Sequence, residues 1–451
     1  MLRRIAAALW SKFESRDELK KFGFLAAIFG VIIGTYWAMR PVRDSVFGSM
    51  IGLKAYQPFA KILSLILIVP LIIFYNKLID KYPRQKLFYI LCTAYAIIAL
   101  LFMFAFMDPS IGLANTVKSP YRIIGWLWYV YVESFASLIV ALFWAFTSDI
   151  TKPEAAKRGF PLIALVGQMG NMIGPRMLNV DTLGFDSSAP LVGIFSIFML
   201  SIAVFLFLFM KVTPKSQMVG FKSQEELSSV KGEPVKNKKK SGFLDGLKLL
   251  LTNKYLLGIA SIIVFFEVIV TMLDYNFKSM AGEHFPIERE LSAYFSQYAY
   301  YTGIVATLCV LFGINSIQRK LGMTASLVLM PIIVFIAVVT LRINPVLPVA
   351  FWIMVFSKAV NYALNQPTLK QAYIPTSKAS KYKAQSWIEM FASRSSKAVG
   401  SGINIFGGRL PMFYIFLSTT VSLGLIGVWI FVAIFVAKTY NKAVKENRIV
   451  C

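Results

Sequence analysis

Residues 87–107 read Leu-Phe-Tyr-Ile-Leu-Cys-Thr-Ala-Tyr-Ala-Ile-Ile-Ala-Leu-Leu-Phe-Met-Phe-Ala-Phe-Met, a run without one charged side chain. About 20 apolar residues in an α-helix span the hydrocarbon core of a bilayer, which is roughly 30 Å thick. Phe195–Met210 and Leu425–Ala437 are further uncharged runs. Their apolar residues occur on every face of a helix, so these segments are predicted to cross a membrane and not to lie on its surface.

The composition of the whole chain supports the same conclusion. Hydrophobic residues make up 57% of the 451 residues and charged residues only 15%, against about 25% charge in a soluble domain. We predict an all-α membrane protein of about 12 transmembrane helices. The helices are expected at 22–50, 56–75, 87–107, 123–147, 160–180, 191–211, 255–278, 291–313, 323–341, 346–365, 385–406 and 411–438. Two six-helix halves joined by a linker are typical of the major-facilitator type.

Five parts of the chain are predicted from these helices. They are a cytoplasmic segment 1–21, a first half 22–211, a basic linker 212–254 with a short amphipathic piece at 243–252, a second half 255–438 and a tail 439–451. The first apolar run ends in Trp37-Ala-Met-Arg40 and is too long for the apolar region of a signal peptide. We expect it to be a permanent helix.

The charge is strongly basic, with 47 Lys and Arg against 22 Asp and Glu. In a membrane protein, basic loops on the cytoplasmic side account for most of such an excess. The loops after the second and fourth helices are basic, as are the linker and the tail, whereas 181–190 and 342–345 are poor in Lys and Arg. We therefore predict cytoplasmic termini and no nucleic-acid partner.

Several classes of site are absent from the sequence. Cys92, Cys309 and Cys451 are far apart and His284 is the single histidine, so neither a disulfide framework nor a metal site is predicted. No Gly-x-x-x-x-Gly-Lys-Ser/Thr loop occurs. We expect no cofactor and no enzymatic activity, and any cargo must bind to side chains from several helices.

Two similar halves place a transported molecule at their interface in major facilitators. The segment 76–86 looks like the Gly-x-x-x-Asp-x-x-Gly-Arg loop of that superfamily, although its glycines are missing. Ser316–Gly322 occupies the matching place in the second half.

Charged residues inside the predicted helices are the candidates for function, since each costs roughly 2.5–3.5 kcal/mol at the bilayer centre. The first helix ends in Arg40-Pro-Val-Arg43-Asp44. This stretch is either a plain helix end with a proline kink or a cationic patch in which Asp44 braces Arg43. Glu133 lies far from both ends of its helix, either as a cargo-site acid or as the structural partner of a buried base.

The second half carries more such charges. Asp274 and Lys278 are one helical turn apart and are expected to pair. Gly400 and Gly402 allow close packing beside the group Glu389, Arg394 and Lys397. Counted together, buried bases outnumber buried acids, and a net-positive cavity with aromatic walls suits an anion such as a nucleotide. The predicted substrate-binding residues are Arg40, Arg43, Glu133, Asp274, Lys278, Lys358, Lys370, Arg394 and Lys397. The candidates for proton coupling are Glu133, Glu267 and Asp274.

From about residue 20 to 440 the chain resembles the nucleotide transporters (ATP/ADP translocases) of intracellular bacteria and plastids. The stretches that carry the likeness are Arg40–Asp44, Leu142–Phe146, Ile150–Arg158, Leu247–Tyr255, Asp274 with Lys278, Ser357–Pro375, and Glu389 with Arg394, Lys397 and Gly400.

The resemblance implies a cargo site on the first, fourth, seventh and tenth predicted helices. Arg43 takes the place of the family's lysine in the first helix, and Asp274 takes the place of its acid in the seventh. The family's acid in the fourth helix aligns without gaps to Val132, one residue before Glu133. The family's lysine after the tenth helix aligns to Leu369, one residue before Lys370. A step of one residue turns a side chain by about 100°. A one-residue bulge would restore the register.

The resemblance implies a multi-pass carrier of ATP, ADP or a related nucleotide in a bacterial inner membrane, working by alternating access. An inner plastid envelope would look similar. Membrane lipid is the other expected partner, with no obligate protein partner. Two alternatives remain open: a proton-coupled carrier of another organic or phosphorylated anion, and a non-transporting membrane receptor or lipid-handling protein.

Overall fold

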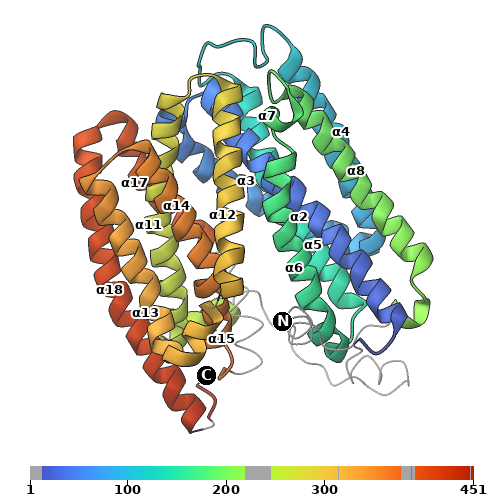
Figure 1. Cartoon of the computed structure of the whole chain (residues 1–451), viewed down its shortest axis with the longest axis vertical. Helices are drawn as coiled ribbons and strands as arrows, with labels where there is room; N and C mark the ends of the chain where they lie inside the picture. The colour runs from blue at the N-terminus through green and yellow to red at the C-terminus, as the bar shows by residue number, and fades with distance from the viewer. Residues whose placement is uncertain are drawn as a thin grey trace. The chain divides into compact units, whose positions relative to one another are not determined.

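The computed structural model of the chain describes residues 13–218, 245–312, 314–376, 388, 392–446 and 448–450. Within these ranges all regular structure is helical (Figure 1). The predicted all-α class is therefore confirmed. The linker lysines at 236–240 and Glu389 lie outside the described residues.

The helices follow the predicted order. The first part of the chain contains α2 (Arg16–Met50), α3 (Leu53–Lys81), α4 (Arg84–Met107), α5 (Ile123–Asp149), α6 (Pro153–Met177), the short α7 (Val180–Leu183), α8 (Ala189–Val212) and the 3₁₀ turn η1 (Lys215–Met218). The second part contains α10 (Asp245–Thr252), α11 (Lys254–His284), α12 (Glu288–Phe312), α13 (Ile314–Ile343), α14 (Leu347–Val360), the π-helical segment η2 (Asn361–Asn365), α15 (Gln366–Ala372), α17 (Ser393–Arg409) and α18 (Pro411–Lys445).

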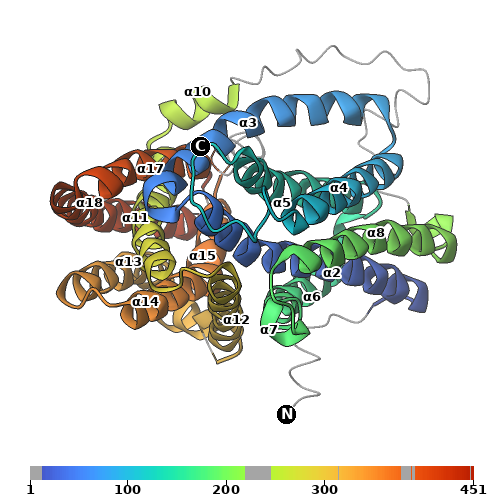
Figure 2. The same cartoon turned by 90° about the horizontal axis from the view of Figure 1, so that it is seen from above.

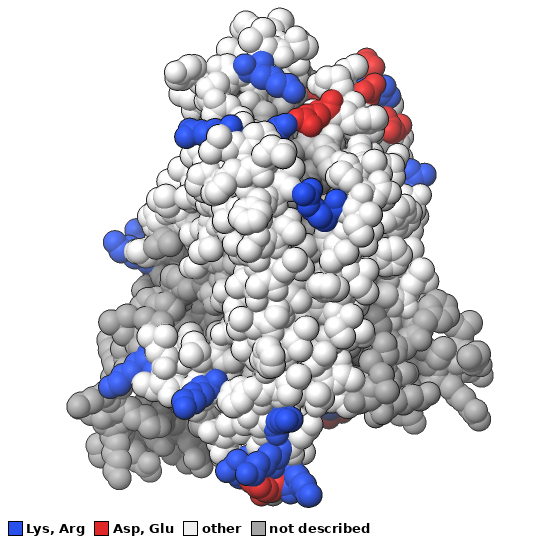
Figure 3. All heavy atoms as spheres, turned by 90° about the vertical axis from the view of Figure 1, so that its left-hand side faces the viewer, with Lys and Arg blue, Asp and Glu red and all other residues white. Residues whose placement is uncertain are grey.

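Eight helical segments in the described part of the chain are long and apolar enough to cross a membrane. They are α2, α4, α5, α8, α11, 322–343 of α13, 347–372, and α18. The other four predicted spans correspond to α3, α6, α12 and α17. On the face seen in Figure 3, charged side chains lie mainly toward the two ends, and uncharged ones cover most of the band between. This is the pattern of a surface that contacts lipid in its middle.

The chain forms two compact units. The first unit comprises Met1–Met50, Leu67–Lys239 and Ile287–Tyr300, and the second comprises Ile51–Ile66, Lys240–Pro286 and Tyr301–Cys451. Helices α3 and α12 thus contribute residues to both. The boundaries 22–211 and 255–438 stay a prediction.

In the first unit, glycines bring α2 and α6 together. A Cβ at Gly170 would collide with the carbonyl oxygen of Gly30, and one at Gly174 with that of Gly34. Glycines four residues apart on both helices let two backbones approach this closely. Helices α4 and α8 also pack against each other and run side by side in Figure 1.

In the second unit, α11 packs against α13, α14, α17 and α18 (Figure 2). A Cβ at Gly400 of α17 would lie 2.9 Å from the carbonyl oxygen of Val268. The predicted close packing at Gly400 is therefore confirmed. At Gly402 the prediction is wrong, since a Cβ there would meet nothing within 4 Å. Gly402 is two residues along the helix and faces away from α11.

Candidate functional site

Arg43 is the centre of a charged cluster in the first unit, where it is 2% exposed. Its Nη2 donates to both carboxylate oxygens of Asp44, at 2.8 and 3.0 Å, and its Nη1 donates to Glu133 of α5. The guanidinium also lies over the ring of Tyr129, 4.6 Å from its centroid. Asp44 therefore braces Arg43 as predicted, and Glu133 pairs with a buried base.

Arg40 lies one turn before Arg43 on α2 and has a different environment. Its guanidinium lies over the ring of Trp37, 4.6 Å from the centroid, and 5.8 Å from that of Tyr36. Such cation–π contacts hold a guanidinium without neutralising its charge. The side chain is partly exposed.

Asp274 of α11 is the centre of a cluster in the second unit. Its Oδ2 lies 2.8 Å from Nζ of Lys61 and 3.1 Å from Nζ of Lys278. The predicted pair of Asp274 and Lys278, one helical turn apart, is thus confirmed. Lys61, which is not among the predicted site residues, is a second cation on the same oxygen, and Lys358 of α14 is close enough to act on the charge of Asp274.

A third group joins α11 to α17 in the second unit. Glu267 accepts a hydrogen bond from Ser393 at 2.9 Å, and Nζ of Lys397 lies 3.8 Å from the same oxygen. The expectation that all the candidate bases are buried is wrong for Lys397 and Lys370, which are exposed. Arg394 is partly exposed. At Lys370 the reason is local, since Leu369 occupies the inward position of α15 with 2% exposure.

The model of the TLC ATP/ADP transporter family matches residues 2–445. This chain belongs to that family. An ADP,ATP carrier protein 1 of Rickettsia prowazekii (strain Madrid E) is 24% identical over 95% of each chain. An ADP,ATP carrier protein 1 of Chlamydia muridarum (strain MoPn / Nigg) is 25% identical, covering 92% of this chain and 87% of the relative.

Solved structures place this TLC family member among the major-facilitator-like folds. A bacterial homologue of the iron transporter ferroportin in an inward-facing state aligns with a TM-score of 0.62 at 13% identity, over 92% of this chain and 99% of that one. A mutant of the peptide transporter POT aligns with a TM-score of 0.61 at 10% identity, over 97% of this chain and 99% of that one. At such low identity the likeness concerns the fold alone.

The π-helical segment η2 (Asn361–Asn365) bears on the register at Lys370 in this TLC family member. A π turn accommodates one residue more than an α turn, and such bulges are frequent at functional sites. The segment ends immediately before the helix that carries Lys370. A π turn therefore lies directly before the helix that carries Lys370, and the correspondence of Lys370 with the family lysine stays a prediction.

Glu133 contacts Arg43 from a regular α-helix, without a π turn. Helix α5 is α-helical from Ile123 to Asp149. Val132, to which the family acid aligns, is fully buried, whereas Glu133 itself bonds to Arg43. The contact with Arg43 is therefore made by the residue one position on, without a bulge.

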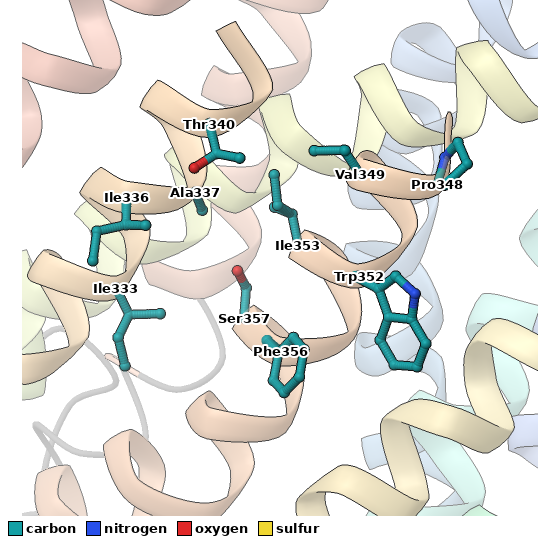
Figure 4. Close-up of a pocket in the computed structure, with 10 residues that line it drawn as sticks. All are labelled: Ile333, Ile336, Ala337, Thr340, Pro348, Val349, Trp352, Ile353, Phe356 and Ser357. Atoms are coloured by element: carbon teal, nitrogen blue, oxygen red, sulfur yellow. The ribbon is translucent and has the colours of Figure 1, made fainter. Parts of the chain in front are cut away.

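The TLC family member also has an apolar groove between α13 and α14, with a volume of about 400 Å³ (Figure 4). Its walls include Ile336, Trp352 and Phe356, which are 56%, 45% and 50% exposed. Phosphate groups bind to cations and hydrogen-bond donors. Among the described residues, no lysine or arginine lines this groove, so it is not a candidate nucleotide site.

Proposed function

We propose that this chain exchanges ATP for ADP across a bacterial inner membrane by alternating access, with both termini cytoplasmic. Membership of the TLC ATP/ADP transporter family supports this, as do relatives named ADP,ATP carrier proteins that match along nearly their whole length. The observation that carries the proposal is the pair of largely buried ionic clusters, one around Arg43 and one around Asp274.

The cluster of the second unit has the charge that an anionic cargo needs. Lys61, Lys278 and Lys358 are three cations around the one carboxylate of Asp274. A phosphate offers several oxygens to ammonium groups in place of a single carboxylate oxygen. We infer that nucleotide phosphate displaces Asp274 from one or both lysines, and that Lys370, Arg394 and Lys397 add to the positive field.

In the cluster of the first unit, a phosphate of the cargo can replace one of the two carboxylates that bind Arg43. All three polar nitrogens of Arg43 are engaged by Asp44 and Glu133. The Glu133 side chain is 30% exposed and that of Asp44 only 6%. Glu133 is therefore the carboxylate that a phosphate replaces, while Asp44 keeps Arg43 in position.

The surplus of cations also favours exchange over one-way transport. Keeping cations in a low-dielectric site costs free energy that an anion offsets. After release of its nucleotide, the carrier would have to reorient with three lysines around the carboxylate of Asp274. Binding of a second nucleotide adds negative charge to this cluster, so ADP moving one way favours the movement of ATP the other way.

The test is uptake of labelled ATP into liposomes that contain the full chain, with and without ADP inside. Internal ADP should stimulate uptake, and the Lys278→Ala and Arg43→Ala variants should abolish the stimulated part. Lys442→Ala is the matched control, because Lys442 is 65% exposed near the end of α18. Equal uptake with and without internal ADP would refute exchange. A folded protein that transports no nucleotide would refute the proposal that the cargo is a nucleotide.

A further inference from the structure

Glu288, the first residue of α12, is a buried acid that is not among the predicted site residues. It is 7% exposed, and its hydrogen-bond partners Ser45 and Ser188 belong to the first unit as it does. Its Oε1 accepts from the hydroxyl of Ser45 at 2.6 Å and from that of Ser188 at 2.7 Å. Its Oε2 accepts from the backbone N–H of Ser188 at 3.1 Å. Residues from α2, from the turn before α8 and from α12 thus meet at one carboxyl group.

Glu288 differs from the three acids that were candidates for proton coupling. Glu133, Glu267 and Asp274 each have a lysine or arginine within 4.0 Å. In the described part of the chain Glu288 has none. A nearby cation favours the charged form of a carboxyl group, and burial without one favours the neutral form.

The charged residues around Glu288 are engaged elsewhere or exposed. Arg289, next along α12, donates to the carbonyl of Phe185 at 2.9 Å and lies 3.4 Å from Asp181. Arg43 of α2 is held by Asp44 and Glu133. Asp186 and Glu290 are exposed. None of these groups neutralises Glu288.

The hydroxyl groups around Glu288 can serve both of its protonation states. Each serine hydroxyl has one hydrogen to donate and lone pairs to accept. When Glu288 is ionised, Ser45 and Ser188 both donate to Oε1. When Oε1 carries a proton, it donates to one hydroxyl, whose own hydrogen turns to a second acceptor. Ser45 has the carbonyl of Val42 at 3.2 Å for this purpose, and Ser188 has the hydroxyl of Ser292 at 3.1 Å.

We propose that Glu288 is a proton-binding site, with Ser45 and Ser188 as the hydroxyls that hold it in both states. Hydronium transfers a proton to Oε1 and leaves as water, so an O–H bond forms at the carboxyl group, and the hydroxyl hydrogens rotate with no heavy atom displaced. Ile287, directly before Glu288, is 56% exposed, so the carboxyl group lies one residue from the protein surface at the start of α12. Ser45 is two residues from Arg43 on α2, so ionisation of Glu288 adds a negative charge beside the helix that carries the first-unit cluster. This link to transport rests on the proposed function.

Infrared difference spectra of the full chain in lipid vesicles test the site without any transport. As the pH falls, the wild type should gain the C=O stretch of a protonated carboxyl group that Glu288→Gln lacks. Glu290→Gln, which changes an exposed acid two residues on, should leave in place the band that Glu288→Gln lacks. Ser188→Ala should move the midpoint of the band to higher pH, because the ionised carboxylate loses a donor. If Glu288→Gln does not fold, Glu288→Asp should move the midpoint of the same band.

Identical difference spectra for the wild type and Glu288→Gln, or an unmoved band in Glu288→Asp, would overturn the proposal. The transport arm measures ATP/ADP exchange against pH. Exchange should depend on pH in the wild type and not in Glu288→Gln, and equal dependence would overturn the link to transport. A wild type that moves no nucleotide would refute the proposed function while the infrared result still decides the proton site.

Discussion

Nζ of Lys61 on α3 lies 2.8 Å from Oδ2 of Asp274 on α11. The two residues are 213 positions apart in the sequence. Because Lys278 lies 3.1 Å from the same oxygen, removal of Lys61 leaves Asp274 paired and the fold supported. Lys61 is therefore a cation that can be tested for cargo binding without loss of the protein.

Lys61→Ala should weaken nucleotide binding. A hydrogen bond to a charged group contributes about 1.5–3 kcal/mol, which corresponds to about 10–150-fold in affinity. We expect the KM for ATP uptake to rise within that range. Lys54→Ala is the control, because Lys54 precedes it on α3 and forms an exposed pair with Glu283 at 2.7 Å. Equal KM values for the two variants would show that Lys61 does not contact the cargo.

Arg43 should be needed for stability as well as for transport. Arg43→Ala removes the base that pairs with Asp44, whose side chain is 6% exposed, and breaking a buried pair costs about 3–5 kcal/mol. We expect a large fall in the midpoint of thermal unfolding in detergent. The double variant Arg43→Gln/Asp44→Asn removes both charges and should recover much of the stability but no ATP uptake. Recovered uptake would mean that the pair is structural only.

The sequence predicts those features that depend on neighbours along one helix. Asp274 and Lys278 are four residues apart, and helical geometry alone brings them together. Uncharged runs such as Leu87–Met107 identify their helices because a bilayer requires such runs. The bracing of Arg43 by Asp44 is local in the same way.

Contacts between distant helices could not be predicted, because they depend on how helices are rotated and packed. In the sequence nothing distinguishes Lys61 from other lysines in predicted helices, and its contact with Asp274 depends on α11 lying beside α3. Glu288 lies in the run Glu288-Arg-Glu290, which has the composition of an exposed helix start. Only the fold brings Ser45 and Ser188 to it. The π segment before Lys370 likewise has no signal in the residue types of Asn361–Asn365.

The glycine contact between α2 and α6 should tolerate no side chain. In Gly174→Ala the new methyl group would overlap the carbonyl of Gly34, so the two helices must separate, at a cost on the order of 1–3 kcal/mol or more. Gly427→Ala on α18 is the control, because a Cβ there meets nothing within 4 Å. Thermal unfolding of the purified variants in detergent checks this. A Gly174→Ala midpoint equal to that of Gly427→Ala would contradict the close approach.

An ion pair between Glu18 and Arg158 should hold the start of α2 to α6, and its two charges can be exchanged by mutation. Nη2 and Nε of Arg158 lie 2.8 and 3.0 Å from the same oxygen of Glu18, which is 3% exposed. Arg158→Glu places two acids together and should lower the free energy of unfolding, because the buried carboxylate of Glu18 then loses its base and meets a like charge. Glu18→Arg places two arginines side by side and should cost less, because Glu14 also pairs with Arg158 and offsets part of the repulsion. The double variant Glu18→Arg/Arg158→Glu restores opposite charges. Unfolding midpoints of the wild type, both single variants and the double variant form a thermodynamic cycle. If the double variant loses as much as the two single variants added together, the two residues do not interact, and α2 is held to α6 by its glycines alone.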